Sequence, residues 1–260
     1  KAADKEIKFV HTFHGHLLDD PEFSGLKKFV IIVLERALAK RSEKLVTVGQ
    51  RVADELLQEE IGNPNQYVNI PPGVVALRNI EKSEARREIG ITVDRQVIGW
   101  LARVTGVKNP LLAAEVAREI PEAQFIFGGD GDLSDQLKNS LPSNAKVYGW
   151  VDAATFISAC DVILSTSENE GMPVALIEAQ MASKPVVATN VGSVSEVVIN
   201  DQTGLVVSKV KDALVEALRE LLSDGAKLQR FGNEAAKHAN SNFSPSVMVQ
   251  KHLDLYRLLA

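Results

Sequence analysis

The chain has 260 residues, of which 45% are hydrophobic and 24% are charged, a composition typical of a soluble globular protein with one or two domains. Its formal charge of −5 disfavours nucleic acid as a partner, because phosphate backbones repel a chain of the same sign. The apolar run at residues 29–34 is too short to span a bilayer, and the charged opening segment lacks a signal-peptide pattern. A single cysteine, Cys160, cannot form an internal disulfide, so we expect a reducing compartment.

Short apolar runs alternate with longer amphipathic segments along the chain. Strands are predicted at residues 7–12, 44–48, 67–70, 96–101, 124–127, 145–148, 161–165, 185–189 and 204–207. Helices are predicted at residues 25–40, 51–60, 83–89, 110–120, 174–182 and 213–222. This alternation favours βαβ units, that is, parallel sheets covered by helices on both faces.

A domain boundary is indicated at residues 70–74, where two prolines and a glycine interrupt both kinds of element. Residues 71–242 hold six predicted strands, enough for one complete doubly wound, Rossmann-type α/β domain. Residues 1–70 hold only three, so we interpret them as the second half of another such domain. Residues 243–260 are predicted to form a C-terminal helix that crosses back, with Ser244 as N-cap and Pro245 in the first helical position.

The segment from Ser165 to Val198 carries the strongest chemical signal. After a buried strand, Gly171 allows a tight turn, and a helix is predicted to begin near Pro173. Ligands of open α/β sheets bind at the carboxyl ends of strands, and a helix N-terminus favours phosphate. Glu170 and Glu178 would repel phosphate, so we interpret them as acceptors for hydroxyls of a sugar and of a ribose. The alternative is that both are solvated surface glutamates.

A basic loop follows the predicted strand at residues 96–101. Arg103 and Lys108 flank Gly106 in this loop, and both would suit a pyrophosphate whose charge grows during bond cleavage. The alternative is that the two are ordinary surface cations. Because the loop follows a strand of the same sheet as the Glu170 segment, both can face one crevice.

Two further loops are candidates for contacts with a nucleotide. The glycine-rich loop around Gly129 does not match a dinucleotide fingerprint, and either a nucleotide approaching its backbone or a plain tight turn explains its small residues. Residues 148–152 could present Trp150 to a base, although a packed tryptophan is the favoured interpretation there.

Three histidines, His11, His14 and His16, cluster at the end of the first predicted strand. No partner ligand stands at a recognisable spacing, so we predict no metal site. His14, next to Gly15, is interpreted either as a hydrogen-bond donor to a reacting substrate or as a core histidine.

Taken together, Arg103, Lys108, the Glu170–Glu178 pair, the string NEGMPVALIEA and the string TFHGH resemble one family. They are similar to the retaining, nucleotide-sugar-dependent glycosyltransferases of the GT-B fold, family four. The resemblance covers the chain from residue 7 to residue 207, and the five motifs occur in the family's order. It implies that residues 71–242 form the donor-binding domain and residues 1–70 part of the acceptor-side domain.

The resemblance also implies a role for each motif. Arg103 and Lys108 would bind the diphosphate of the donor, Glu170 the hydroxyls of the transferred sugar and Glu178 those of the ribose. His14 would face the transferred sugar. Backbone amides near Gly171, Met172 and Val174 would assist at the diphosphate, and Pro173 would also belong to the donor site. The nucleobase pocket would be formed by Gly129, Trp150 and Val151.

The implied reaction transfers a glycosyl group with retention of configuration, from a UDP- or GDP-type sugar, without metal or cofactor. Its place would be polysaccharide or cell-envelope glycan synthesis, with a glycan or lipid-linked acceptor. We expect a cytoplasmic protein, peripheral at most at the inner face of the membrane. Because the first half of the N-terminal domain is missing from this sequence, acceptor and membrane contacts would lie in that absent segment.

Two local departures from the family pattern are present. Ser193 stands where a second glycine often follows Gly192, and Trp100 with Ala102 replaces the commoner glycine before the arginine. Two alternatives to a transferase stay open: a nucleotide-sugar-binding module without turnover, and a hexosamine 2-epimerase of the same fold.

Overall fold

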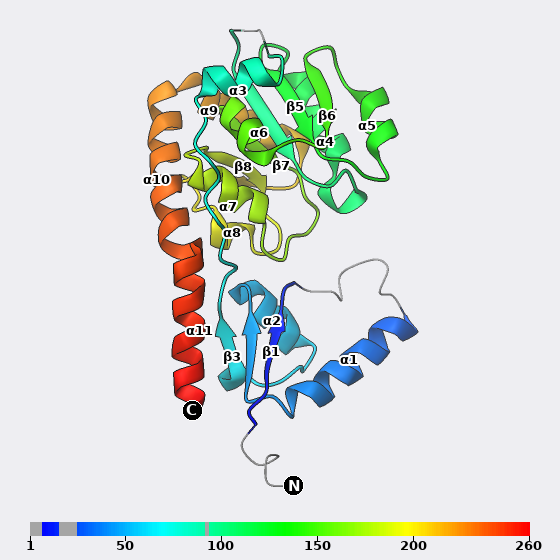
Figure 1. The fold of residues 1–260 in the computed structure, drawn as a ribbon. Coiled ribbons are helices and arrows are strands. Elements are labelled where there is room, and N and C mark those ends of the chain that lie inside the picture. The colour runs from blue at the N-terminus through cyan, green and yellow to red at the C-terminus, as the bar shows by residue number, and fades with distance from the viewer. Residues whose placement is uncertain (1–6, 16–24, 92–93) are drawn as a thin grey trace. The chain divides into compact units, whose positions relative to one another are not determined.

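A computed structural model describes residues 7–15, 25–91 and 94–260. The chain divides into two compact units (Figure 1). Unit 1 comprises Lys1–Gly73 together with Pro245–Ala260, and unit 2 comprises Val74–Ser244. The C-terminal helix α11 (Pro245–Leu259) therefore belongs with the N-terminal part of the chain.

Unit 1 is built on three parallel strands in the order β1-β2-β3. They are β1 (Val10–Phe13), β2 (Lys44–Thr47) and β3 (Tyr67–Asn69), joined through the helices α1 (Leu26–Ala39) and α2 (Gln50–Gln58) and the 3₁₀ turn η3 (Pro64–Gln66). The central strand β2 is apolar and buried, as the middle strand of a parallel sheet should be.

Helix α11 closes one side of unit 1. Its Leu255 packs with Val46 and Ile70 in a small buried cluster, against which Met248 also packs. The backbone N–H of Gly73 donates a hydrogen bond to the Met248 sulfur at 3.2 Å. Thus the last helix of the chain contributes to the core of the first unit. Helix α1, by contrast, exposes most of its apolar side chains; Leu26 and Phe29 are 77% and 63% exposed.

Unit 2 is a six-stranded parallel sheet in the order β6-β5-β4-β7-β8-β9. The strands are β4 (Val97–Leu101), β5 (Gln124–Gly128), β6 (Ala145–Gly149), β7 (Val162–Ser165), β8 (Val186–Thr189) and β9 (Gly204–Val207). The helices are α3 (Lys82–Glu88), α4 (Pro110–Glu119), α5 (Ser134–Ser140), α6 (Ala153–Ala159), α7 (Val174–Met181), α8 (Val194–Val197), α9 (Lys211–Ser223) and α10 (Gly225–Phe243), with the 3₁₀ turn η4 (Gly106–Lys108).

Alternate residues of each strand feed two cores, one on each face of this sheet. Phe125 and Phe127 of β5 join one core, which α4 and α9 cover. Ile126, between them in the sequence, joins the other, which α6, α7 and α10 cover. The strands are therefore apolar on both sides and read as continuous runs, which is why the sequence located them.

The predicted strands are all present, with small shifts at their ends. The largest is at β1, which was predicted from residue 7 and begins only at Val10. Four helices of unit 2 were missed, namely α5, α6, α8 and α10, and α10 with 19 residues is the longest helix in the described structure.

Candidate functional site

The order of the strands identifies a switch point in unit 2. From β4 the chain proceeds outward through β5 and β6, and then crosses to β7 on the other side of β4. Loops that leave the carboxyl ends of β4 and β7 therefore diverge, and a crevice forms between them. The loop after β4 carries Arg103 and Lys108, and the loop after β7 carries Glu170, so the predicted site residues meet at this point.

The loop after β4 presents two cations. Lys108 ends the short turn η4, and Asn109 then adopts a left-handed conformation with φ of 45° and caps α4, its side chain accepting the N–H of Leu112. The Arg103 side chain is exposed, and its guanidinium has no hydrogen-bond or ion-pair partner within the described part of the chain. The positive charge of Arg103 is therefore not neutralised by any side chain in the described part of the chain.

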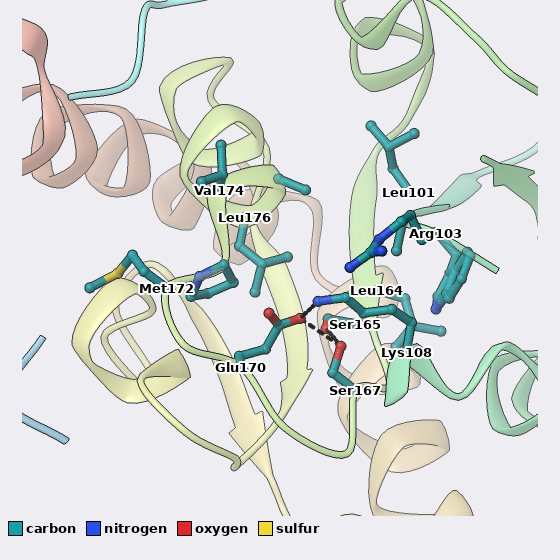
Figure 2. A pocket seen from close by; sticks show the side chains of 14 residues that line it. Leu101, Arg103, Lys108, Leu164, Ser165, Ser167, Glu170, Met172, Val174 and Leu176 are labelled. Atoms are coloured by element: carbon teal, nitrogen blue, oxygen red, sulfur yellow. Dashed lines mark hydrogen bonds and ion pairs between the residues drawn. The ribbon is translucent and has the colours of Figure 1, made fainter. Parts of the chain in front are cut away.

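Glu170 is bound from two sides. Its Oε1 lies 2.7 Å from the Lys108 Nζ and accepts a hydrogen bond from the Ser167 Oγ, also at 2.7 Å. The side chains of the ion pair are largely buried, 22% exposed for Lys108 and 10% for Glu170. Figure 2 shows Arg103 and Lys108 both directed toward this carboxylate. The sequence interpretation had treated the acidic and basic residues separately, whereas the structure joins them.

These residues line a cavity of about 480 Å³. Its walls come from the end of β4, the loop after it, the end of β7 and the first turns of α7 (Figure 2). This volume suits a small organic ligand rather than a polymer. The lining residues are Trp100, Leu101, Ala102, Arg103, Lys108, Leu164, Ser165, Ser167, Glu170, Met172, Pro173, Val174, Ala175 and Leu176.

Glycines hold the neighbouring loops against both charged segments. Gly129 has a φ of 120°, and a Cβ there would stand 1.9 Å from the carbonyl oxygen of Ala102, beside Arg103. Gly192 has a φ of 47°, and a Cβ there would stand 1.8 Å from the carbonyl oxygen of Glu170. On the side where a Cβ would point, the Gly129 backbone is therefore in direct contact with the Ala102 backbone.

Helix α7 begins at Val174, as predicted, and ends at Met181. Pro173 is its N-cap, with a ψ of 86°, and Val174 is the first helical residue. Glu178 follows Val174 by four positions and so lies on the same face one turn further along. Glu178 is half-buried, its pKa is raised by that burial, and it is not among the residues that line the cavity.

The predicted nucleobase residues lie at the ends of β5 and β6, outside the lining of the cavity. The preferred interpretation of Trp150 as a packed side chain is wrong: it is 81% exposed, because it follows β6 at the edge of the sheet. Val151 is half-buried and packs against the second core. Asp152 caps α6, and hydrogen bonds from Arg78 and from Thr155 lower its pKa to about 2.

The histidines belong to unit 1. His14 is exposed in the turn directly after β1, which excludes the core-histidine alternative. The Nε2 of His11 lies 3.7 Å from a carboxylate oxygen of Glu35. His16 falls outside the described residues. Among the described residues, no three side chains of the metal-ligating types converge on one point.

Three hydroxyl side chains beside the cavity were not predicted from the sequence. Ser165, Thr166 and Ser167 are all buried at the end of β7, and the Thr166 hydroxyl accepts a hydrogen bond from the indole nitrogen of Trp100 at 3.0 Å. Three consecutive hydroxyl residues at the exit of an apolar strand are the signal that would have found them. They also explain Trp100, one of the departures from the family pattern, as a buried hydrogen-bond donor.

Ser193, the other departure, sits behind Glu170. Its backbone N–H donates to the carbonyl oxygen of Glu170 at 3.0 Å, and its own hydroxyl is buried without a hydrogen-bond partner among the described residues. The substitution of a glycine by serine here is thus accommodated inside the protein rather than in the cavity.

No helix in the described part of the chain is both long and apolar enough to cross a membrane.

A family model for glycosyl transferases group 1 matches residues 81–238, more than half of the chain and most of unit 2. Among curated proteins, the UDP-Gal:alpha-D-GlcNAc-diphosphoundecaprenol alpha-1,3-galactosyltransferase of Escherichia coli is 27% identical over 265 residues, covering 95% of this chain and 68% of that protein. The D-inositol 3-phosphate glycosyltransferase of Rhodococcus jostii is 27% identical over 246 residues, covering 86% of this chain and 54% of that protein. The chain thus spans about half to two thirds of the length of these relatives.

Solved structures agree on the fold. Sucrose-phosphate synthase from Thermosynechococcus elongatus superposes with a TM-score of 0.84 at 20% identity, over 97% of this chain and 68% of that one. Anabaena Alr3699/HepE in complex with UDP-glucose gives a TM-score of 0.82 at 20% identity, over 96% of this chain and 72% of that one. With parallel sheets, a cavity at the switch point and a matching family model, the chain belongs to the glycosyl transferases group 1 family and has the α/β architecture of the GT-B glycosyltransferases.

Proposed function

We propose that unit 2 binds the donor of a retaining glycosyltransferase that uses a UDP- or GDP-type nucleotide sugar. The observation that carries this proposal is the cavity at the β4–β7 switch point, where Arg103 and Lys108 face the start of α7. Two cations and a helix N-terminus together favour a diphosphate. One of the structural neighbours is described in complex with UDP-glucose, which supports the same class of donor.

In this proposal the charged residues act on the leaving group. Arg103, without a partner in the described chain, takes one phosphate, and Lys108 reaches the other while it stays close to Glu170. Amides at Gly171, Met172 and Val174 add hydrogen bonds at the helix start. As the bond to the sugar lengthens, negative charge grows on the diphosphate and these groups stabilise it more strongly than in the ground state.

The remaining contacts are assigned by the chemistry of each side chain. Glu170 accepts hydrogen bonds from hydroxyls of the transferred sugar through its second carboxylate oxygen, since Lys108 and Ser167 both contact Oε1. Glu178 accepts hydrogen bonds from the ribose hydroxyls. Gly129, Trp150 and Val151 receive the base, and the 81% exposure of Trp150 leaves its ring available for stacking. His14, from unit 1, is proposed to face the transferred sugar.

The pair of glutamates is not proposed as the acid and nucleophile of a glycosidase. Glu170 already accepts two contacts through its Oε1, from Lys108 and from Ser167, and acts in this proposal as an acceptor. The chemistry is therefore proposed to proceed without metal or cofactor, through charge held by side chains and amides.

The acceptor and the cellular role follow by similarity. The Escherichia coli relative is named for a diphosphoundecaprenol-linked acceptor and the Rhodococcus relative for inositol phosphate. We propose a glycan or lipid-linked acceptor, a role in polysaccharide or cell-envelope synthesis, and a cytoplasmic location that is at most peripheral to the membrane.

Calorimetry with UDP, GDP and ADP on the 260-residue chain tests donor binding. At least one nucleotide is expected to bind, and Arg103→Ala is expected to weaken it by at least about tenfold, because a charge-assisted hydrogen bond to phosphate contributes roughly 1.5–3 kcal/mol. Arg95→Ala is the matched control, since Arg95 is also exposed but precedes β4 at the opposite edge of the sheet.

Two outcomes would contradict the proposal: no binding of any of the three nucleotides, or equal affinity in the Arg103 variant and the Arg95 control. A radiolabelled nucleotide sugar then separates the remaining possibilities. Transfer with an α-linked product from an α-linked donor supports the retaining enzyme, whereas binding without turnover supports a binding module, and release of the 2-epimeric sugar supports an epimerase.

A further inference from the structure

Two short segments next to the cavity are joined by several hydrogen bonds. The Lys108 segment (residues 107–109) comprises the last two residues of the turn η4 and Asn109, and the β7 exit segment (residues 166–168) directly follows β7. The backbone N–H of Glu168 donates to the carbonyl oxygen of Val107 at 2.8 Å, and the Asn109 Nδ2 donates to the Glu168 Oε1 at 2.6 Å. Lys108 lies between these two attachment points.

Thr166 makes the central attachment. Its Oγ1 lies 3.1 Å from the carbonyl oxygen of Lys108 and 2.8 Å from that of Asn109, and the hydroxyl donates toward both. The same oxygen accepts the indole N–H of Trp100 at 3.0 Å. Thr166 is fully buried and Trp100 is 2% exposed. The single hydroxyl proton and one lone pair are therefore both committed, and the orientation of the hydroxyl is fixed.

The position of Lys108 depends on this anchor. A lysine side chain has four rotatable bonds and three equivalent donors, so it does not fix its own ammonium in space. Here the ammonium sits 2.7 Å from the Glu170 Oε1, and in this side-chain conformation a backbone displacement of about 1 Å would stretch that contact beyond hydrogen-bond range. Glu170, in turn, is held by Ser167 from the same β7 exit segment.

From this geometry we infer that Thr166 is a positioning residue for Lys108. Its hydroxyl, itself held by Trp100, fixes the backbone of Lys108 and Asn109 so that the ammonium reaches Glu170 and the diphosphate of the donor. The role toward the diphosphate rests on the proposed function. The role toward Lys108 and Glu170 rests on the hydrogen bonds alone.

The test compares Thr166→Val, which keeps the shape and removes the hydroxyl, with Thr166→Ser, which keeps the hydroxyl. Thr203→Val is the matched control: Thr203 is equally buried, its hydroxyl accepts the N–H of Ile199, and it precedes β9 at the amino end of the sheet. The first readout is the rate of Lys108 acetylation by an amine-directed reagent, followed by peptide mass spectrometry, with Lys227 as the internal reference.

In Thr166→Val the acetylation of Lys108 is expected to accelerate severalfold, because the ammonium leaves its ion pair. Thr166→Ser and Thr203→Val are expected to react as the wild type does. Trp100→Phe, which removes only the indole donor, is expected to show a smaller acceleration in the same direction. If Thr166→Val does not fold, the acetylation rate of Lys108 in Trp100→Phe decides whether the hydroxyl of Thr166 positions Lys108.

The second readout is the affinity for UDP. Thr166→Val is expected to weaken binding by about tenfold, less than the ~100-fold that a 1 Å misplacement can cost in catalysis. In a Lys108→Met background the same change is expected to have no further effect, because the residue that it positions is gone.

Wild-type acetylation rates in both Thr166→Val and Trp100→Phe would overturn the inference, and so would equal acceleration in Thr166→Ser and Thr166→Val. A wild-type chain that does not bind UDP, GDP or ADP, but whose Lys108 responds to Thr166→Val, would refute the proposed function and leave the positioning role supported. Full loss of UDP affinity by Thr166→Val in the Lys108→Met background would show that Thr166 does not act through Lys108.

Discussion

Replacement of Gly192 by alanine perturbs the support of Glu170 most directly. The backbone at Gly192 is left-handed, with a φ of 47°, which costs an L-residue roughly 1–2 kcal/mol. The new Cβ would stand 1.8 Å from the Glu170 carbonyl oxygen, so one of the two loops must move by more than 1 Å. Such overpacking costs about 1–3 kcal/mol. The hydrogen bond from the Ser193 N–H to the same oxygen adds about 1 kcal/mol if it breaks.

We therefore expect Gly192→Ala to lower the free energy of unfolding of unit 2 by about 3–6 kcal/mol. Gly90→Ala is the matched control. Gly90 also has a positive φ, of 72°, but nothing lies within 4 Å of a Cβ built there. Gly90→Ala is expected to cost only the conformational part, about 1–2 kcal/mol.

The assay is urea unfolding of the full chain followed by tryptophan fluorescence. Both tryptophans of the chain, Trp100 and Trp150, lie in unit 2, so the signal reports that unit. Calorimetry with UDP on the same proteins measures whether the displaced Glu170 loop also weakens donor binding. If Gly192→Ala and Gly90→Ala lower the free energy of unfolding by the same amount, the close approach of Gly192 to Glu170 does not affect stability, which contradicts the prediction.

Three further outcomes follow from contacts elsewhere in unit 2. The hydrogen bond from Arg78 is the main reason why the folded pKa of Asp152 is about 2, so its carboxylate stabilises the fold above about pH 4 and loses this effect as the pH falls toward 2. The urea midpoint of Asp152→Asn should therefore fall less between pH 5 and pH 3 than that of the wild type. An equal fall in both proteins would contradict this. Asn144→Ala removes an amide that donates to three backbone carbonyls at 2.9–3.0 Å. Urea unfolding should show that the free energy of unfolding falls by about 2–4 kcal/mol. A change near zero would mean that water replaces the amide. Trp150→Ala should leave stability within about 0.5 kcal/mol and reduce UDP affinity about fivefold; equal affinity would remove Trp150 from the base site.

The strands of unit 2 were predictable because burial on both faces makes them continuous apolar runs. Helix α6 was missed for the same physical reason. All seven of its residues, from Ala153 to Ala159, are buried or nearly so, and the helix shows no polar face whose period could reveal it. Its only local signal is the cap Asp152, whose side chain accepts the N–H of Thr155.

Helix α10 was missed because its local sequence disfavours a helix. It begins with Gly225, and Gly232 lies in its interior, where glycine costs about 1 kcal/mol relative to alanine. Tertiary contact explains that glycine: a Cβ at Gly232 would stand 2.3 Å from the carbonyl oxygen of Ser183. The buried positions Phe231, Ala235 and Ala239 repeat every four residues, and this spacing was the available signal.

The charged residues of the site were predictable from their place after strands, but their connections were not. Sequence spacing brings Arg103, Lys108 and Glu170 to one edge of the sheet, and the cavity contains all three. The ion pair between Lys108 and Glu170 depends instead on which strands are neighbours. Only the strand order, with β4 beside β7, reveals that the two loops touch and that Thr166 joins them.

The hydrogen bonds between the Lys108 segment and the β7 exit segment limit which insertions and deletions the chain can accept. The attachments match individual residues, Val107 to Glu168 and Asn109 to both Thr166 and Glu168. One inserted or deleted residue in either segment would shift this register and carry Lys108 away from Glu170. We expect changes in loop length within residues 107–109 or 166–168 to be rejected.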